Sequence, residues 1–246
     1  VEMRGIDKAV IILDVSASML HWSLVEIFRA QALGNINPMA FPKWKQASLA
    51  ARYAYQTINQ GARFQFILFS DVVRDIAGNE LNSKNKLSWE KKNSVYNGQI
   101  LSKGSVKHDL LIDKALRKVR VSGGTNLQKA IESISSLVPR PEKILLITDG
   151  LPNKLEKMNL RNTGLSCPIN IFGLRKSNKV RTVSGKCRFE IGIESVEKFT
   201  NKLSRVPVDI VLLPLEGDPL AVRFYTLLAG QSGGKVITPS YDWLIN

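Results

Sequence analysis

Oxygen-bearing side chains gather in three short segments of this chain: Asp14–Met19, Gly123–Asn126 and Asp149–Gly150. The candidate donors in them are two carboxylates and three hydroxyls, and the segments hold no histidine or cysteine. An all-oxygen donor set suits a hard divalent cation such as Mg²⁺, with Mn²⁺ or Ca²⁺ as alternatives. The chemistry to expect is therefore cation binding, through Asp14, Ser16, Ser18, Thr125 and Asp149.

The spacing of these residues explains how they could meet one ion. Asp14, Ser16 and Ser18 alternate along the chain, so their oxygens can converge on one point. Gly123 and Gly124 let a second backbone segment approach closely and supply the next residue, Thr125. If the hydroxyls bind directly and the carboxylates act mainly through water, the ion keeps much of its positive charge. It could then accept an Asp or Glu from a partner protein.

The elements that must position these residues follow from alternating apolar and amphipathic stretches. We expect strands at Ala9–Val15, Phe64–Phe69, Val72–Ile76, Ile144–Thr148, Val208–Leu213 and Lys235–Thr238. We expect helices at Lys43–Ile58 after Pro42, His108–Val119, Asn126–Leu137, and Pro219–Leu228 ended by Gly230. This alternation predicts an α/β fold with a mostly parallel, doubly wound central sheet, flanked by helices on both faces. Ligands of such sheets bind at the carboxyl ends of strands, where the oxygen-bearing segments fall.

The motifs around the five residues resemble those of von Willebrand factor A domains. Asp14-x-Ser16-x-Ser18, Thr125 and Asp149 match all five positions of that family's metal-ion-dependent adhesion site. The surrounding stretches AVIILDVSASM, GGTNLQKAI, ILLITDGLPN and YTLLAGQSGGKVI are also similar, so the resemblance covers most of the chain. It implies a Rossmann-like domain with Mg²⁺ at the upper edge of its sheet, and protein binding rather than catalysis.

One domain is expected over residues 1–246, because no linker marks a boundary. Relative to the family, insertions are expected at about 20–41, 79–120 and 159–205, and the first two lie next to the metal edge. Residues 79–106 are polar and weakly patterned. The chain begins with Val1 rather than Met, which is compatible with a piece of a longer protein.

An enzyme is the less favoured interpretation. His21 lies close in sequence to Ser16 and Ser18, which suggests a Ser-His-Asp hydrolase, but no G-x-S-x-G motif is present. The stretch GQSGGKV is one residue short of a phosphate-binding loop and lacks its hydroxyl, so we interpret it as a turn between a helix and a strand. Cys167 and Cys187 could form a disulfide, an alternative favoured slightly over two free thiols.

The charge is the one outlier in the composition. With 35 Lys and Arg against 21 Asp and Glu, the net charge is +14. Three basic runs, Lys84–Lys92, Lys114–Arg120 and Arg175–Arg188, hold much of the excess. An acidic protein partner fits this charge, and the alternative function is a basic domain that binds nucleic acid or an anionic surface, with a structural or vestigial metal site. Apolar runs are too short to span a membrane. The compartment, bacterial cell envelope or cytoplasm, stays open.

Overall fold

The structure is a computed structural model of the whole chain. It describes residues 2–23, 37–82, 86–89, 101–153 and 205–240, together with residues 185, 188, 189, 192, 193, 196, 201 and 203. Of the expected insertions, residues 24–36, 83–85, 90–100 and most of 159–205 lie outside the described residues. Cys167 and Cys187 lie outside them too, so the expected disulfide stays a prediction.

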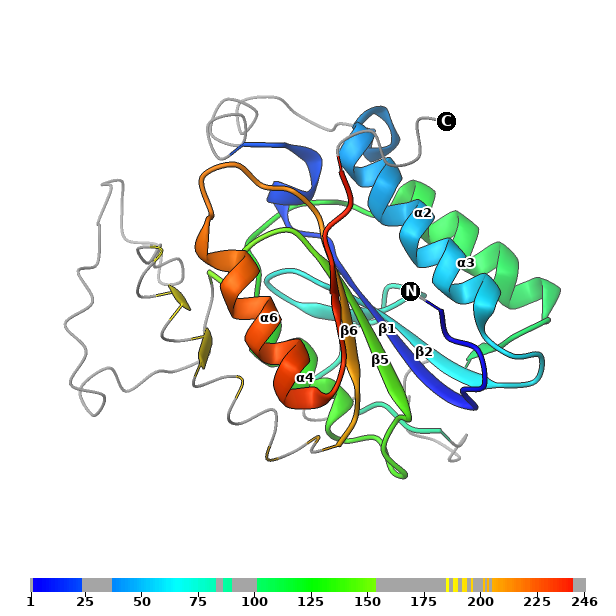
Figure 1. The fold of residues 1–246 in the computed structure, drawn as a ribbon. Helices are drawn as coiled ribbons and strands as arrows, with labels where there is room; N and C mark the ends of the chain where they lie inside the picture. Colours follow the sequence, from blue (N-terminus) through cyan, green and yellow to red (C-terminus); the bar gives the residue numbers. More distant parts are fainter. Residues whose placement is uncertain are drawn as a thin grey trace.

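A seven-stranded sheet forms the centre of the molecule, with its path in the order β3-β2-β1-β5-β6-β7 and with β4 also paired to β2 (Figure 1). The strands are β1 (Lys8–Asp14), β2 (Arg63–Phe69), β3 (Val73–Asp75), β4 (Leu101–Ser102), β5 (Lys143–Thr148), β6 (Val208–Leu212) and β7 (Val236–Ile237). In the order β2-β1-β5-β6-β7, each strand is parallel to the next, whereas β3 and β4 run antiparallel to β2. The predicted α/β class with a mostly parallel sheet is therefore confirmed.

Helices cover both faces of this sheet. They are α2 (Pro42–Thr57), α3 (Val106–Lys118), α4 (Leu127–Ile134) and α6 (Leu220–Ser232), and two short 3₁₀ helices, η1 (Ala17–Leu20) and η2 (Pro38–Ala40), accompany them. Figure 1 shows α2 and α3 side by side on one face and α4 and α6 on the other. The indole Nε1 of Trp44 in α2 donates to the carbonyl of Leu116 in α3, at 3.2 Å, which ties the first pair together.

Successive side chains of a strand point to opposite faces of the sheet, so the core forms two apolar layers, one on each face. On β1, Val10 and Ile12 face the α4 and α6 side, while Ala9, Ile11 and Leu13 face α2 and α3. All five are buried because parallel strands covered on both faces expose neither side. This double burial explains the continuous apolar run that predicted the strand.

Some element ends differ from the prediction. Helix α6 continues past the predicted end at Gly230 as far as Ser232. Gly233 caps it in the left-handed conformation, with φ 80°. Helix α4 ends at Ile134, three residues before the predicted Leu137. The predicted polar stretch 79–106 contains the short strand β4, which pairs with the start of β2. The other predicted helices and strands agree with the structure to within two residues at their ends.

No helix among the described residues is long and apolar enough to cross a membrane.

Candidate metal centre

Asp14 is the last residue of β1, at the carboxyl edge of the sheet. Its side chain is completely buried, and both carboxylate oxygens accept hydrogen bonds. The backbone N–H of Ser16 donates to Oδ1 at 2.8 Å, and the hydroxyl of Thr148 donates to Oδ2 at 2.7 Å. Asp14 thus links the turn after β1 to the end of β5, its neighbour in the sheet.

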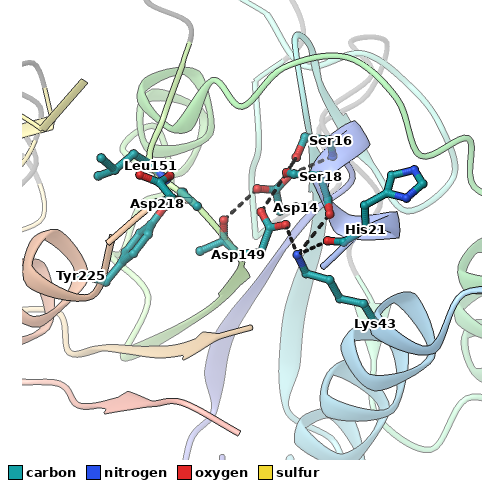
Figure 2. Close-up of polar contacts among 11 residues, drawn as sticks. Asp14, Ser16, Ser18, His21, Lys43, Asp149, Leu151, Asp218 and Tyr225 are labelled. Carbon is teal, nitrogen blue, oxygen red and sulfur yellow. Dashed lines mark hydrogen bonds and ion pairs between the residues drawn. The ribbon is translucent and has the colours of Figure 1, made fainter. Parts of the chain in front are cut away.

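Two serine hydroxyls extend this connection. Ser16 Oγ and Ser18 Oγ lie 3.0 Å apart, and the hydroxyl of Ser18 donates to Asp149 Oδ1 at 2.9 Å. Figure 2 shows Asp14, Ser16, Ser18 and Asp149 turned toward one another. Four of the five predicted ligands therefore form one hydrogen-bonded cluster. They lie at or just after the ends of β1 and β5.

Thr125, the fifth predicted ligand, lies on a loop that is bonded to the first one through the backbone. Ala17 N–H donates to Gly123 O at 3.1 Å, and Ser122 N–H donates to Val15 O at 2.8 Å. Gly123 has φ 87°, and an added Cβ would lie 2.8 Å from the carboxylate of Asp71, so any other residue would be strained there. The same carboxylate accepts from the N–H of Gly124 at 2.6 Å.

Asn153 ties the loop of Thr125 to the loop of Asp149. Its side-chain oxygen accepts from the N–H of Thr125 at 2.8 Å, and its own N–H donates to the Thr125 carbonyl at 3.1 Å. Each of the three loops is thus hydrogen-bonded to the other two. The structure places the predicted segments together, as the topology of a parallel sheet requires.

A lysine from α2 enters the same cluster. The ammonium of Lys43 lies 2.5 Å from Asp149 Oδ2, and both side chains are completely buried. It also donates to the carbonyls of Ser18, at 3.1 Å, and His21, at 2.7 Å (Figure 2). The cluster therefore contains a positive charge that the sequence pattern did not predict.

The loop of Asp149 is supported from the opposite face of the sheet as well. Asp218 accepts from the N–H of Leu151 at 2.8 Å and forms an ion pair with Arg188 at 3.1 Å. The hydroxyl of Tyr225, on α6, donates to the carbonyl of Gly150 at 2.8 Å. Burial raises the pKa of Tyr225 well above its usual value, and the nearby Asp14 adds to the rise, so this phenol stays a donor.

Burial, and secondarily the neighbouring Asp149, raise the pKa of Asp14 to about 7 from 3.8. Two carboxylates close together in a buried place disfavour simultaneous ionisation, and a bound cation would relieve that repulsion. Among the described residues no group of three or more His, Cys, Asp and Glu side chains could hold a metal. A cation at this edge would therefore depend on hydroxyl oxygens as well, and the donor set of two carboxylates and three hydroxyls fits Mg²⁺.

Access to the cluster is narrow. Asp14, Ser16, Thr125 and Asp149 are each no more than 3% exposed, and only Ser18 of the five is partly exposed. A ligand from solvent would reach the cluster on the side of Ser18.

Sequence reasoning missed the residues that hold the cluster from outside its three segments. The sequence pattern predicts Lys43 only as the start of an amphipathic helix, and Asp71 and Asp218 lie outside the three oxygen-bearing segments. Asp71 carries a usable signal, because it follows β2, the strand beside β1, at the same edge of the sheet. The sequence carries no such signal for Lys43, since a lysine at the start of a helix is ordinarily exposed.

Comparison with solved structures finds a von Willebrand factor type A protein from Catenulispora acidiphila. The match covers 95% of this chain at 14% sequence identity, with a TM-score of 0.53. This chain has a von Willebrand factor A fold. It spans 38% of the length of the Catenulispora chain that it matches. No protein-family model matches the sequence, and no curated protein matches it.

The von Willebrand factor A fold accounts for the meeting of the three loops at one edge. At 14% identity it carries the architecture alone, so the five predicted ligands are not transferred from the Catenulispora protein. The metal-ion-dependent adhesion site stays a prediction supported by the hydrogen-bonded cluster described above.

Proposed function

We propose that this domain is a divalent-metal-dependent protein-interaction module, part of a larger assembly, which acts by binding rather than by catalysis. The observation that carries the proposal is the chain of contacts from Ser16 through Ser18 to Asp149, which gathers hydroxyl and carboxylate oxygens at the carboxyl edge of a von Willebrand factor A fold. Mg²⁺ is the proposed cation, and an Asp or Glu of a partner protein is its proposed outer ligand.

Each proposed ligand has a role that follows from its chemistry. The hydroxyls of Ser16, Ser18 and Thr125 are neutral donors, so coordination through them leaves the ion electrophilic. Asp14 and Asp149 supply the negative charge that holds a cation in a buried place. A partner carboxylate would approach past the partly exposed Ser18, where it meets the least steric hindrance.

The first experiment measures metal binding directly. We expect isothermal titration with MgCl₂ or MnCl₂ to give one saturable site in the unmodified protein. Asp14→Ala and Ser18→Ala should each weaken that site by about tenfold or more, because each removes an oxygen donor or a compensating charge. Ser133→Ala is the matched control, since among the described residues its hydroxyl bonds only to the Lys129 carbonyl of its own helix.

The second experiment tests the interaction itself. A candidate partner should bind the unmodified protein in Mg²⁺ and dissociate in EDTA. It should not bind Asp14→Ala even in Mg²⁺. An affinity unchanged by both EDTA and Asp14→Ala contradicts the metal-bridged mechanism. Absence of any titratable site for Mg²⁺ and Mn²⁺ contradicts the metal centre.

A further inference from the structure

Lys43 is an unusual residue for its position. It is the second residue of α2, within the first turn, where the helix macrodipole disfavours a positive charge. It is also completely buried, which penalises the charged form of a lysine. Both costs must be offset by specific partners.

The partners account for every proton of the ammonium group. A lysine has three N–H donors, and Lys43 gives them to Asp149 Oδ2, Ser18 O and His21 O. Two of these acceptors belong to the loop that carries Ser16 and Ser18, and the third is a proposed metal ligand. One side chain therefore holds the first loop and Asp149 together.

The charges in the cluster also indicate a role for Lys43 in cation binding. Asp14 and Asp149 would place two negative charges in a buried environment, and Lys43 supplies one positive charge against them. A divalent cation arriving at the cluster would be attracted by the carboxylates and repelled by the ammonium. Because Lys43, Asp14 and Asp149 are buried, this repulsion is weakly screened.

We propose that Lys43 is a resident counter-ion of the candidate metal centre, which keeps the loops assembled when no metal is bound and lowers the affinity for divalent cations by competing for Asp149. The inference rests on the proposed metal centre and adds a regulation to it. The centre fills only where the divalent cation is plentiful, and it stays folded where the cation is scarce. Lys43 is in this sense a positioning residue, since it acts through Asp149 and the first loop.

The test compares metal affinity in variants that remove the charge. Lys43→Met keeps the length and apolar stem of the side chain, and Lys43→Gln keeps an amide donor for the carbonyls of the first loop. We expect calorimetric titration to show about a tenfold or greater decrease in Kd for Mg²⁺ and Mn²⁺ in both variants. Lys45→Met is the matched control, because it removes the same charge from an exposed position two residues further along α2.

A second measurement keeps the proposal testable if a single variant folds poorly. In EDTA, Lys43→Met and Asp149→Asn should each lower the Tm, because each leaves the other member of a buried pair without its counter-charge. The double variant should lose less Tm than the sum of the two single losses. Mg²⁺ should raise the Tm of Lys43→Met by more than it raises that of the unmodified protein.

The outcomes separate this proposal from the proposed function. If the unmodified protein binds Mg²⁺ and both Lys43 variants bind it equally or more weakly, the counter-ion role is overturned while the metal centre stands. If neither the unmodified protein nor the variants bind, both are overturned. If only the variants bind, the counter-ion role is supported and the native domain does not use this metal.

Discussion

Asp14 shows how one residue can belong to the core and to the site at once. Its backbone ends the central strand, and its carboxylate is enclosed by Ser16, Thr148 and Asp149. An ionised carboxylate is costly in such a place, which is why its pKa rises to about 7. This cost should be visible as a pH dependence of folding.

We predict that the metal-free protein loses stability as the pH rises from about 4 to about 7. The folded-state pKa of Asp14, about 7, exceeds the ordinary value of 3.8, so the folded state holds a proton that the unfolded state releases in this window. The contribution of this one group to the free energy of unfolding therefore falls with pH, by at most about 1.4 kcal/mol for each pH unit. Urea unfolding in EDTA at several pH values measures it.

Asp14→Asn should flatten that pH dependence, and saturating Mg²⁺ should do the same because the cation favours the ionised carboxylate. Asp113→Asn is the control, since Asp113 is half-exposed and pairs with Arg52 at 3.0 Å. A pH profile that Asp14→Asn leaves unchanged would show that burial does not perturb this carboxyl.

How far the sequence predicts the candidate site depends on where each residue lies. Asp14 ends a strand, and Ser16, Ser18 and Asp149 come within four residues of a strand end, so the topology alone brings them together. Lys43 and Asp218 begin or precede helices far away in the chain, and their contacts depend on how each helix is rotated on the sheet. A one-dimensional pattern carries the first kind of information and lacks the second.

Among the elements, the end of α6 was the least accurately predicted. Gly230 was expected to end the helix, because glycine weakens helix interiors. The actual end is set by Gly233, whose φ of 80° lets its N–H reach back to the carbonyls of the last turn. Gly234 then passes so close to β6 that an added Cβ would lie 2.0 Å from the carbonyl oxygen of Val208.

Three glycine-to-alanine substitutions in one turn should therefore have three different effects. Gly230→Ala should stabilise the protein by about 0.5 kcal/mol, because the position is helical and an added Cβ would meet no atom within 4 Å. Gly233→Ala should destabilise by about 1 kcal/mol through its left-handed backbone. Gly234→Ala should destabilise by about 2 kcal/mol or more, since the backbone of β6 blocks the methyl group.

Chemical denaturation of the three variants under one condition measures the series, and each variant serves as a control for the others. A stabilising Gly233→Ala, or a neutral Gly234→Ala, contradicts the described packing of α6 against β6. A destabilising Gly230→Ala would contradict the position of Gly230 inside the helix.

At the scale of the whole molecule, the alternation of strands and helices was enough to predict the sheet and its two covered faces. Short elements were harder, because β4 has two residues and gains its stability from pairing with β2 rather than from any local pattern. The net charge of +14 was informative only about partners, since charge does not determine a fold.

The surface of α3 shows where part of that charge lies. Lys107, Lys114, Arg117 and Lys118 are exposed on this helix, while its acidic residues have partners: Asp113 pairs with Arg52, and Asp109 accepts from the hydroxyl of Tyr55. Such a face attracts any polyanion through its charge alone.

We predict that the protein binds a short DNA duplex and anionic phospholipid vesicles only at low salt. Electrostatic association of this kind weakens steeply with salt, so both interactions should disappear by about 0.15 M NaCl and should not respond to EDTA. Fluorescence anisotropy and vesicle sedimentation measure them, and Lys114→Glu with Arg117→Glu should weaken both. Specific binding that persists in higher salt would favour the alternative function, a nucleic-acid or anionic-surface domain.

The place of β1 in the sheet also decides how the molecule bears tension. If a partner binds at the carboxyl edge as proposed, a pull on it would act on Asp14 and Asp149, which end or directly follow two adjacent parallel strands. β1 is bonded to β2 along seven residue pairs and to β5 along five, so a pull along the strand axis loads both ladders in shear at once. Bonds loaded together resist extraction better than bonds opened one by one, so this arrangement would resist a load applied at the edge where the partner is proposed to bind.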